Sequence, residues 1–219
     1  MLYVLRVSLP DQPGSLGEVC AALGGIGADI VSLRVIDRDS FNAVDEICVA
    51  GTGISPERIR TAVESAPGVV VEIVRRIARV LDPLGALQLA DKLARIEAEP
   101  YESLCEGLPE ALGATWALAM KVTGDGPVAI ATSADSPPHG VMETPWLPIT
   151  GPRKLPLGHW APTNWRMHRF ELAAAPLSDP FEFVIVGRWA GMRFRPTELR
   201  QIGLLSDLAV RARRVLAPA

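Results

Sequence analysis

The chain of 219 residues is poor in the residue types that build disulfide frameworks and metal sites. It has three cysteines, an odd number without a Cys-x-x-Cys pair, which argues against a secreted protein and fits a reduced, cytoplasmic compartment. Its three histidines, His139, His159 and His168, match no metal-binding spacing. We therefore predict no metal site and no cofactor.

Basic surplus and long apolar runs are also missing. The 22 basic and 25 acidic side chains give a net charge of −3, which argues against a nucleic-acid partner. No apolar run approaches the roughly 18–20 residues that a membrane helix needs, so we expect no membrane partner. The N-terminal stretch contains Arg6 and alternates like a strand, which is not typical of a signal peptide.

The composition, with 48% hydrophobic and 21% charged residues, is that of a globular protein long enough for two domains. We predict a first domain at 1–78, a connecting helix within 79–99 and a second domain at 100–219. In the first domain, alternating patterns predict strands at 2–9, 31–35, 44–49 and 69–73, and i, i+3, i+4 stripes predict helices at 16–23 and 59–66. This βαββαβ order predicts an α+β fold of the ferredoxin-like kind, a four-stranded antiparallel sheet with two helices on one face.

The junction between the first strand and the first helix combines free backbone N–H groups with acidic side chains. Backbone N–H groups at Gly14, Ser15 and Leu16 have no partner within the helix, and the helix dipole favours a carboxylate there. Asp11 and Asp29 are candidate acceptors for an ammonium group. The alternative interpretation is a tight turn whose Pro and Gly serve only the backbone angles.

Two segments, VSLPDQPGSLGEVCAAL and GADIVSLRV, carry a resemblance to a known family. Because these two segments have the right order and spacing, residues 2–76 resemble the ACT domain, a regulatory module of amino-acid metabolism. The resemblance implies a small-molecule ligand, probably an amino acid, held at the interface of a homodimer. The ligand contacts that it implies are Asp11, Gln12, Pro13, Gly14, Ser15, Leu16, Asp29 and Ile30. Leu9 and Asp29 depart from the family pattern, which leaves open a module that dimerises and binds nothing.

The second face of this sheet is mixed, with the apolar Leu2, Val4, Ile30 and Ile36 beside Arg6, Ser8, Ser32 and Arg34. Such a face is too apolar for solvent and too polar for a sealed core. We expect a partner or the second domain to cover it, which also favours a homodimer.

In the second domain we predict helices around 104–112 and 202–216 and strands at 116–122, 128–132, 168–173 and 181–186. Two segments, LPEALGATWALAMK and FEFVIVGRWAGMRFRPTELRQIGLLSDLAVRARRVL, resemble the start and the end of the GAF domain. The resemblance covers about 101–217 and implies a small-molecule-sensing fold, an antiparallel sheet flanked by helices. The cyclic-nucleotide signature is absent, so the ligand of this domain stays open.

Two further features each allow two interpretations. Residues 134–164 hold seven prolines and two tryptophans, and form either a lid over a pocket or a structural cover or dimer arm. Cys105 is either a nucleophile beside Glu106 or an ordinary core residue.

The sequence favours a non-catalytic regulatory protein that senses an amino acid or a related metabolite through its first domain. No Ser-His-Asp or paired-carboxylate pattern supports a catalytic residue. The alternatives are a regulated enzyme with its pocket in the second domain and a structural dimerisation module without a ligand.

Overall fold

The computed structural model describes residues 1–96, 99–140 and 142–216. The chain forms two compact units, Met1–Val80 and Leu81–Ala219, and each is described by itself. Small parts of the predicted connecting helix, of the insert and of the C-terminal end fall outside the described residues. In the described parts of the chain, no helix is both long and apolar enough to cross a membrane.

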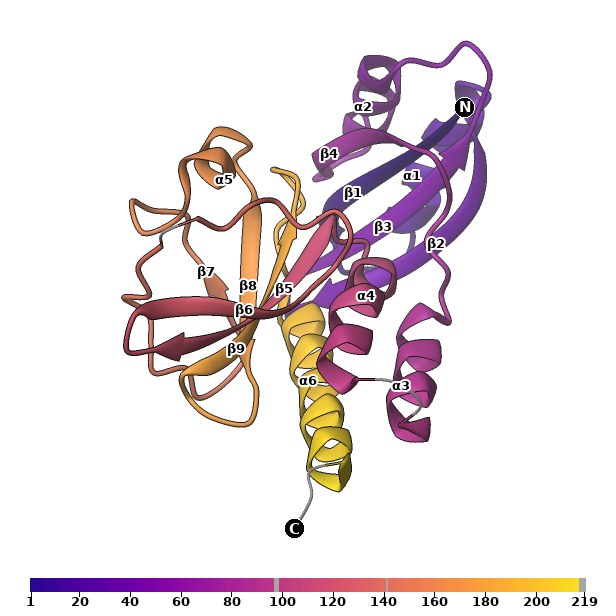
Figure 1. Cartoon of the computed structure of the whole chain (residues 1–219). Coiled ribbons are helices and arrows are strands. Elements are labelled where there is room, and N and C mark those ends of the chain that lie inside the picture. Colours follow the sequence, from indigo (N-terminus) through magenta and orange to yellow (C-terminus); the bar gives the residue numbers. More distant parts are fainter. Residues whose placement is uncertain (97–98, 141, 217–219) are drawn as a thin grey trace. The chain divides into compact units, whose positions relative to one another are not determined.

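The first unit has one antiparallel sheet and two helices, as the α+β prediction requires (Figure 1). The strands pair in the order β2-β3-β1-β4, so β1 and β3 are central and β2 is an edge strand. The elements are β1 (Leu2–Pro10), α1 (Ser15–Gly25), β2 (Asp29–Arg38), β3 (Asn42–Ala50), α2 (Pro56–Glu64) and β4 (Val70–Ile77).

The core of this unit lies between the sheet and its helices. Odd-numbered residues of β1, among them Leu5 and Val7, face Val19 of α1 and Ile59 of α2, and all four are fully buried. The stripes seen in the sequence thus become one apolar layer, and its burial is the main term that stabilises the unit.

On the opposite face of the sheet an ion-pair cluster lies around Arg6 and Glu46, both of which are buried. Arg6 and Arg34 both donate to the Glu46 carboxylate, with 2.8 Å between Arg6 Nη2 and Glu46 Oε2. Burial alone would raise the pKa of Glu46, but the two guanidiniums outweigh it and hold the pKa below its usual value. The two arginines that made this face look mixed therefore share one carboxylate.

The second unit has a five-stranded antiparallel sheet in the order β6-β5-β9-β8-β7. Its helices α3, α4 and α6 lie side by side and pack together (Figure 1). The elements are α3 (Gly85–Arg95), α4 (Pro100–Leu112), β5 (Trp116–Thr123), β6 (Gly126–Thr132), β7 (Arg153–Leu155), α5 (Thr163–Met167), β8 (Glu171–Pro176), β9 (Glu182–Arg188) and α6 (Pro196–Leu216).

The helix α3 differs from the connector that the sequence suggested. Its Leu89 and Leu93 are buried in one cluster with Leu104 of α4 and Ile202 of α6. The helix is therefore part of the core of the second unit, because its apolar stripe is used for packing within that unit.

The insert 134–164 covers the other face of the second sheet. Ile149 and Leu155 are buried against Trp116, Leu118 and Phe183 of the sheet. Trp146 packs edge-on against Phe183 with 4.6 Å between ring centroids. This apolar layer favours the interpretation as a structural cover. A lid must open without exposing core side chains to water, and opening this insert would expose them.

Candidate functional site

The N-terminus of α1 is an uncapped helix end. Gly14 stands before the helix with φ 99°, in the left-handed region that favours glycine, and no side chain caps the helix. The Ser15 N–H donates to the Gln12 carbonyl (3.3 Å), and the Glu18 N–H donates to the Gly14 carbonyl (3.1 Å). Within the described residues, the N–H groups of Leu16 and Gly17 have no such acceptor. Of the N–H groups that the sequence predicted as ligand donors, that of Ser15 is thus used within the turn. That of Leu16 has no backbone acceptor.

The space around this helix end is open. A Cβ atom built on Gly14 or Gly17 would meet no atom of the described residues within 4 Å. Gln12 and Pro13 are exposed beside it, whereas Ser15 is buried. An anion can therefore approach the backbone closely, and the helix dipole adds partial positive charge at that point.

Asp11 is already engaged in an ion pair. Its carboxylate accepts from the guanidinium of Arg38 at the end of β2, with 2.7 Å from Nη2 to Oδ1 and 3.0 Å from Nε to Oδ2. A carboxylate in a bidentate pair is a weaker acceptor for a further ammonium group. The main role of Asp11 is therefore to hold the turn against β2 through Arg38.

Asp29 and Ile30 do not lie near the turn of the same chain. Asp29 pairs with Ala50 at one end of β3, whereas Pro10, just before the turn, pairs with Asn42 at the other end. Eight residues of extended chain span about 26 Å. One subunit alone therefore does not bring the two halves of the expected ligand clamp together.

A different acid, Asp45 of β3, is placed near the turn. It is 2% exposed and pairs in register with Val7 of β1 and Val35 of β2 on the helix-covered face. Among the described residues, its Oδ1 has no hydrogen-bond partner. Burial raises the pKa of Asp45, the nearby Arg38 opposes this, and the carboxylate of Asp11 adds to it.

Asp45 and Arg38 are the functional candidates that sequence reasoning missed. A signal for Asp45 existed: an acid at an inward position of the run AVDEICVA breaks an otherwise apolar strand. Its neighbour Glu46 is satisfied by two arginines on the other face. Only strand pairing shows which of these two acids has a partner.

Replacing Asp45 with Asn is expected to change how stability depends on pH. Because its pKa in the folded state is raised above the ordinary 3.8, the neutral carboxyl favours folding, and the wild type loses stability as the pH rises through that raised pKa. The gain of Asp45→Asn over the wild type should be smallest below pH 4 and reach about 1–3 kcal/mol at pH 7. Urea unfolding across this range, followed by circular dichroism, measures it. A difference that does not vary with pH would contradict the raised pKa.

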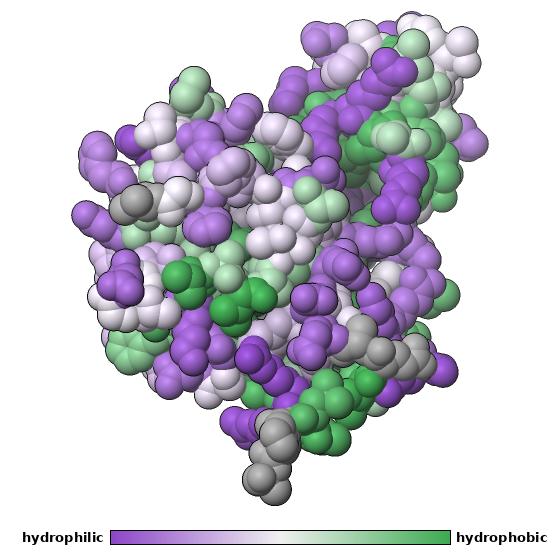
Figure 2. Space-filling view, viewed as in Figure 1, coloured by the Kyte–Doolittle hydropathy of each residue, from purple (hydrophilic) through white to green (hydrophobic). Residues whose placement is uncertain are grey.

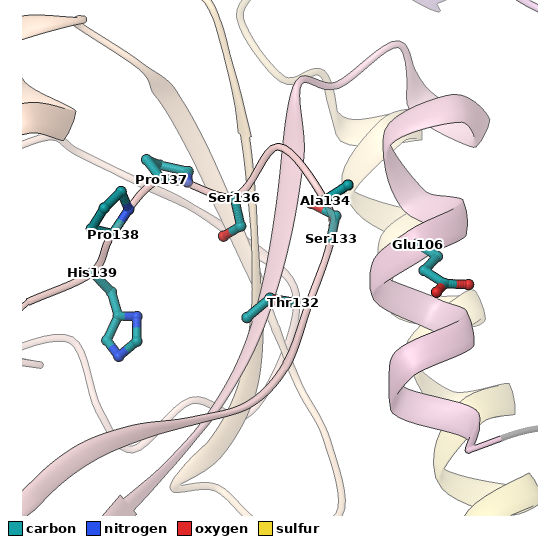
Figure 3. A pocket seen from close by; sticks show the side chains of 8 residues that line it. All are labelled: Glu106, Thr132, Ser133, Ala134, Ser136, Pro137, Pro138 and His139. Carbon is teal, nitrogen blue, oxygen red and sulfur yellow. The ribbon is translucent and has the colours of Figure 1, made fainter.

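The second unit has an open pocket of about 470 Å³ beside α4 and the end of β6. Glu106, Ser133, Ser136 and His139 are among its lining residues, and Figure 3 shows the Glu106 carboxylate pointing away from the serines and the histidine. The Ser133 hydroxyl accepts from the Ala117 N–H at 2.9 Å. These groups do not converge on one point, so the pocket lacks an acid–base arrangement.

Cys105 is a core residue of the second unit. It is fully buried in α4, and burial raises the pKa of its thiol to about 12. A thiol with this pKa carries almost no thiolate at neutral pH, so the packing interpretation holds. Within the described residues, no three His, Cys, Asp or Glu side chains gather in a way that would hold a metal ion.

Comparisons with known proteins give no family. No protein-family model matches the sequence, and no curated protein matches it either. Among solved structures, an unknown protein from Galdieria sulphuraria is similar over 85% of this chain and 79% of its own, with 15% identity and a TM-score of 0.33. A formyltetrahydrofolate deformylase from Pseudomonas putida KT2440 is similar over 44% of this chain and 39% of its own, with 13% identity and a TM-score of 0.31. Similarities this weak carry no argument about function.

Proposed function

We propose that this protein is a non-catalytic, cytoplasmic regulator whose first unit is an ACT-like domain that senses an amino acid or a related metabolite. The observation that carries the proposal is the open N-terminus of α1: among the described residues the N–H groups of Leu16 and Gly17 have no backbone acceptor, and a Cβ built on Gly14 or Gly17 would meet no atom within 4 Å. Such a helix end is suited to a carboxylate. The second unit, with its GAF-like order of elements, is the second part of this regulator.

A homodimer completes the site in this proposal. The edge strand β2 exposes Val31 (48%) and Val35 (53%), and Figure 2 shows hydrophobic surface on this unit. If β2 pairs with its copy about a two-fold axis, the pairing is antiparallel, and the first residues of one strand lie beside the last residues of the other. The partner's Asp29 and the partner's Ile30 would then lie next to Arg38 and the turn.

The homodimer is tested by its mass in solution. Multi-angle light scattering is expected to give twice the 23.5 kDa of the chain, and Val35→Lys is expected to shift the protein toward the monomer, because a charge is placed on the apolar edge. The matched control is Val128→Lys, an exposed valine of the second unit (42%, against 53% for Val35). A monomer mass at every concentration would contradict the dimer.

The ligand is tested first by thermal shift with the twenty amino acids. A ligand at 100 times its dissociation constant stabilises the folded state by about 2.7 kcal/mol. An enzyme would instead consume a compound, and a structural module would show no stabilisation by any of them.

The position of the ligand is then tested at Gly17. A glutamate there can bring its own carboxylate back to the N–H groups of the first turn, and it competes with the ligand. Gly17→Glu is expected to weaken binding in calorimetry by about 10- to 150-fold, the equivalent of one charge-assisted hydrogen bond. The fold should gain stability, because glycine is a poor helix former.

The matched control is Gly17→Gln, which has the same shape without the charge, and it should bind more tightly than Gly17→Glu. Gly14→Val is unsuitable here, because φ 99° is strained for a branched side chain. If both Gly17 variants bind like the parent, the site is not at this helix end.

A further inference from the structure

A groove lies beside the strand β6 in the second unit. Two openings form it, of about 320 and 470 Å³, and Glu106 of α4 and Thr132 of β6 line both of them. The smaller opening is also lined by residues 129–131 of β6 and by Glu102 of α4. The larger one continues along the loop that follows β6, which Figure 3 shows. Because they share lining residues, the two openings make one groove between β6 and α4.

One edge of β6 carries backbone groups that no strand of the described chain pairs. In the order of the second sheet β6 is the last strand, and β5 is its neighbour. The Ser133 N–H donates to the Ala117 carbonyl of β5 at 2.9 Å. Successive N–H groups of a strand point to alternate sides, so the Thr132 N–H points away from β5.

The two ends of this edge differ in what they offer. A bulge in the pairing leaves Ile130 without a partner residue in β5. Pro127, near the start of β6, has no N–H to donate. The end of β6 that lines the groove is therefore the end at which a further strand finds backbone donors and acceptors.

The groove is negatively charged. Glu102 and Glu106 are exposed and stand four residues apart on one face of α4. Glu106 pairs with Lys92 (3.2 Å), whereas no ion pair joins Glu102 to a described residue. Neither lysine nor arginine is among the residues that line the two openings. The groove therefore attracts a positively charged side chain.

The larger opening also holds a hydroxyl without a partner. Ser136 lines it, and the Ser136 Oγ atom is buried and has no hydrogen-bond partner among the described residues. A buried polar atom in this state is costly, and a backbone group of a bound chain that continues past Thr132 would satisfy it.

We infer that this groove binds an extended segment of another protein that carries a lysine or an arginine. The segment pairs with β6 as an additional strand, and its basic side chain lies beside Glu102 and Glu106. A second copy of this chain fits less well, because the seven residues of β6 are uncharged and bring no positive side chain to the glutamates. The surface goes beyond the ligand proposed for the first unit and gives the regulator a place to bind its partner.

The charge selection is tested with the full chain and an array of blocked heptapeptides. Their central residue is lysine, norleucine or glutamate, and the flanking residues vary among valine, isoleucine, threonine and serine. In fluorescence anisotropy the tightest lysine peptides are expected to bind about 10-fold or more tightly than the glutamate peptides, because repulsion replaces attraction. Glu102→Lys is expected to reverse this order. The matched control, Asp207→Lys, changes the charge equally at an exposed acid of α6 that lines neither opening, and it should keep the order.

The strand pairing is tested from both sides of the contact. Thr132→Pro removes the N–H that points away from β5 and should abolish peptide binding. Urea unfolding shows whether this variant is folded. Methylating the backbone nitrogens of the tightest lysine peptide removes the donors on the other side and leaves the protein unchanged, so it should abolish binding as well.

Four outcomes would overturn the inference. Lysine and glutamate peptides that bind alike, or an order that survives in Glu102→Lys, would contradict the charge selection. A methylated peptide that binds like its parent would contradict the strand pairing. Binding of none of the peptides would contradict the groove as a docking surface. If Thr132→Pro lowers the mass in solution from dimer to monomer, the groove holds a second copy instead. Amino-acid binding by the first unit is measured separately and is independent of the peptide results.

Discussion

Replacing Glu198 with Gln is expected to destabilise the second unit by about 3–5 kcal/mol, because it removes a carboxylate that pairs with a buried guanidinium. Arg188 at the end of β9 donates to both oxygens of Glu198, at 2.7 and 2.8 Å, and the two side chains are 1% and 7% exposed. Glu198 also accepts from the Arg195 N–H at the start of α6 (2.8 Å). The carboxylate therefore holds a strand end, a turn and a helix start together.

The same pair explains a motif that the sequence offered as a family resemblance. In the stretch GRWAGMRF, the Arg188 guanidinium stacks over the Phe194 ring, 3.8 Å from its centroid. The arginine and the phenylalanine are therefore both needed to seal the turn before α6. In this chain the motif has a structural role.

Urea unfolding followed by tryptophan fluorescence measures the stability lost in Glu198→Gln, because all five tryptophans lie in the second unit. The control is Glu106→Gln, which breaks the exposed pair with Lys92 (3.2 Å) and should cost less than about 1 kcal/mol. The double replacement Arg188→Met with Glu198→Leu should recover most of the loss, since both members of the ion pair are replaced by apolar side chains. A Glu198→Gln variant as stable as the parent would show that the pair does not hold this turn.

Truncating Ile149 to Ala is expected to cost about 2–5 kcal/mol, the range for a large-to-small change in a packed core. Ile149 lies in the insert, is fully buried, and its N–H donates to the Pro180 carbonyl at 3.0 Å. If the insert opened as a lid, the Ile149 side chain would be in water part of the time. Its truncation would then lower the free energy of unfolding only slightly.

The control for this variant is its exposed neighbour, Thr150→Ala, which should stay within about 0.5 kcal/mol of the parent. Urea unfolding followed by tryptophan fluorescence compares the two. If Ile149→Ala is as stable as the parent, the structural cover is contradicted and the insert is better interpreted as a lid.

Local sequence patterns determined the first unit well. Alternation along 2–9 predicted a strand that the structure has as Leu2–Pro10, and the stripe from Leu16 predicted the helix Ser15–Gly25. The apolar residues of β1 alternate with the polar Arg6 and Ser8, and α1 has a helical apolar stripe, so both periods are visible without any partner. The Pro-Gly turn that opens α1 was visible for the same local reason.

Patterns failed where both faces of an element are buried. The strand expected at 168–173 is Glu171–Pro176. The helix α5 and the strand β7 were missed for another reason: with 5 and 3 residues they are too short to show a period. The run LAAA of β8 is apolar throughout and has no period from which to place its ends. In such a strand the pairing with β9 decides the boundaries.

The sequence by itself determined the α+β class, the order of the elements in the first unit and the uncapped helix end after the Pro-Gly turn. Only the tertiary structure decided which acid lies near that helix end. Asp29 is the first residue of β2, yet it lies at the end of the sheet away from the turn, because β2 begins there beside Ala50. Asp45 is distant from α1 in sequence but lies on the helix-covered face near the turn, since β3 begins at Asn42, which pairs with Pro10. Strand direction and register are relations between elements, and no single stretch of sequence contains them.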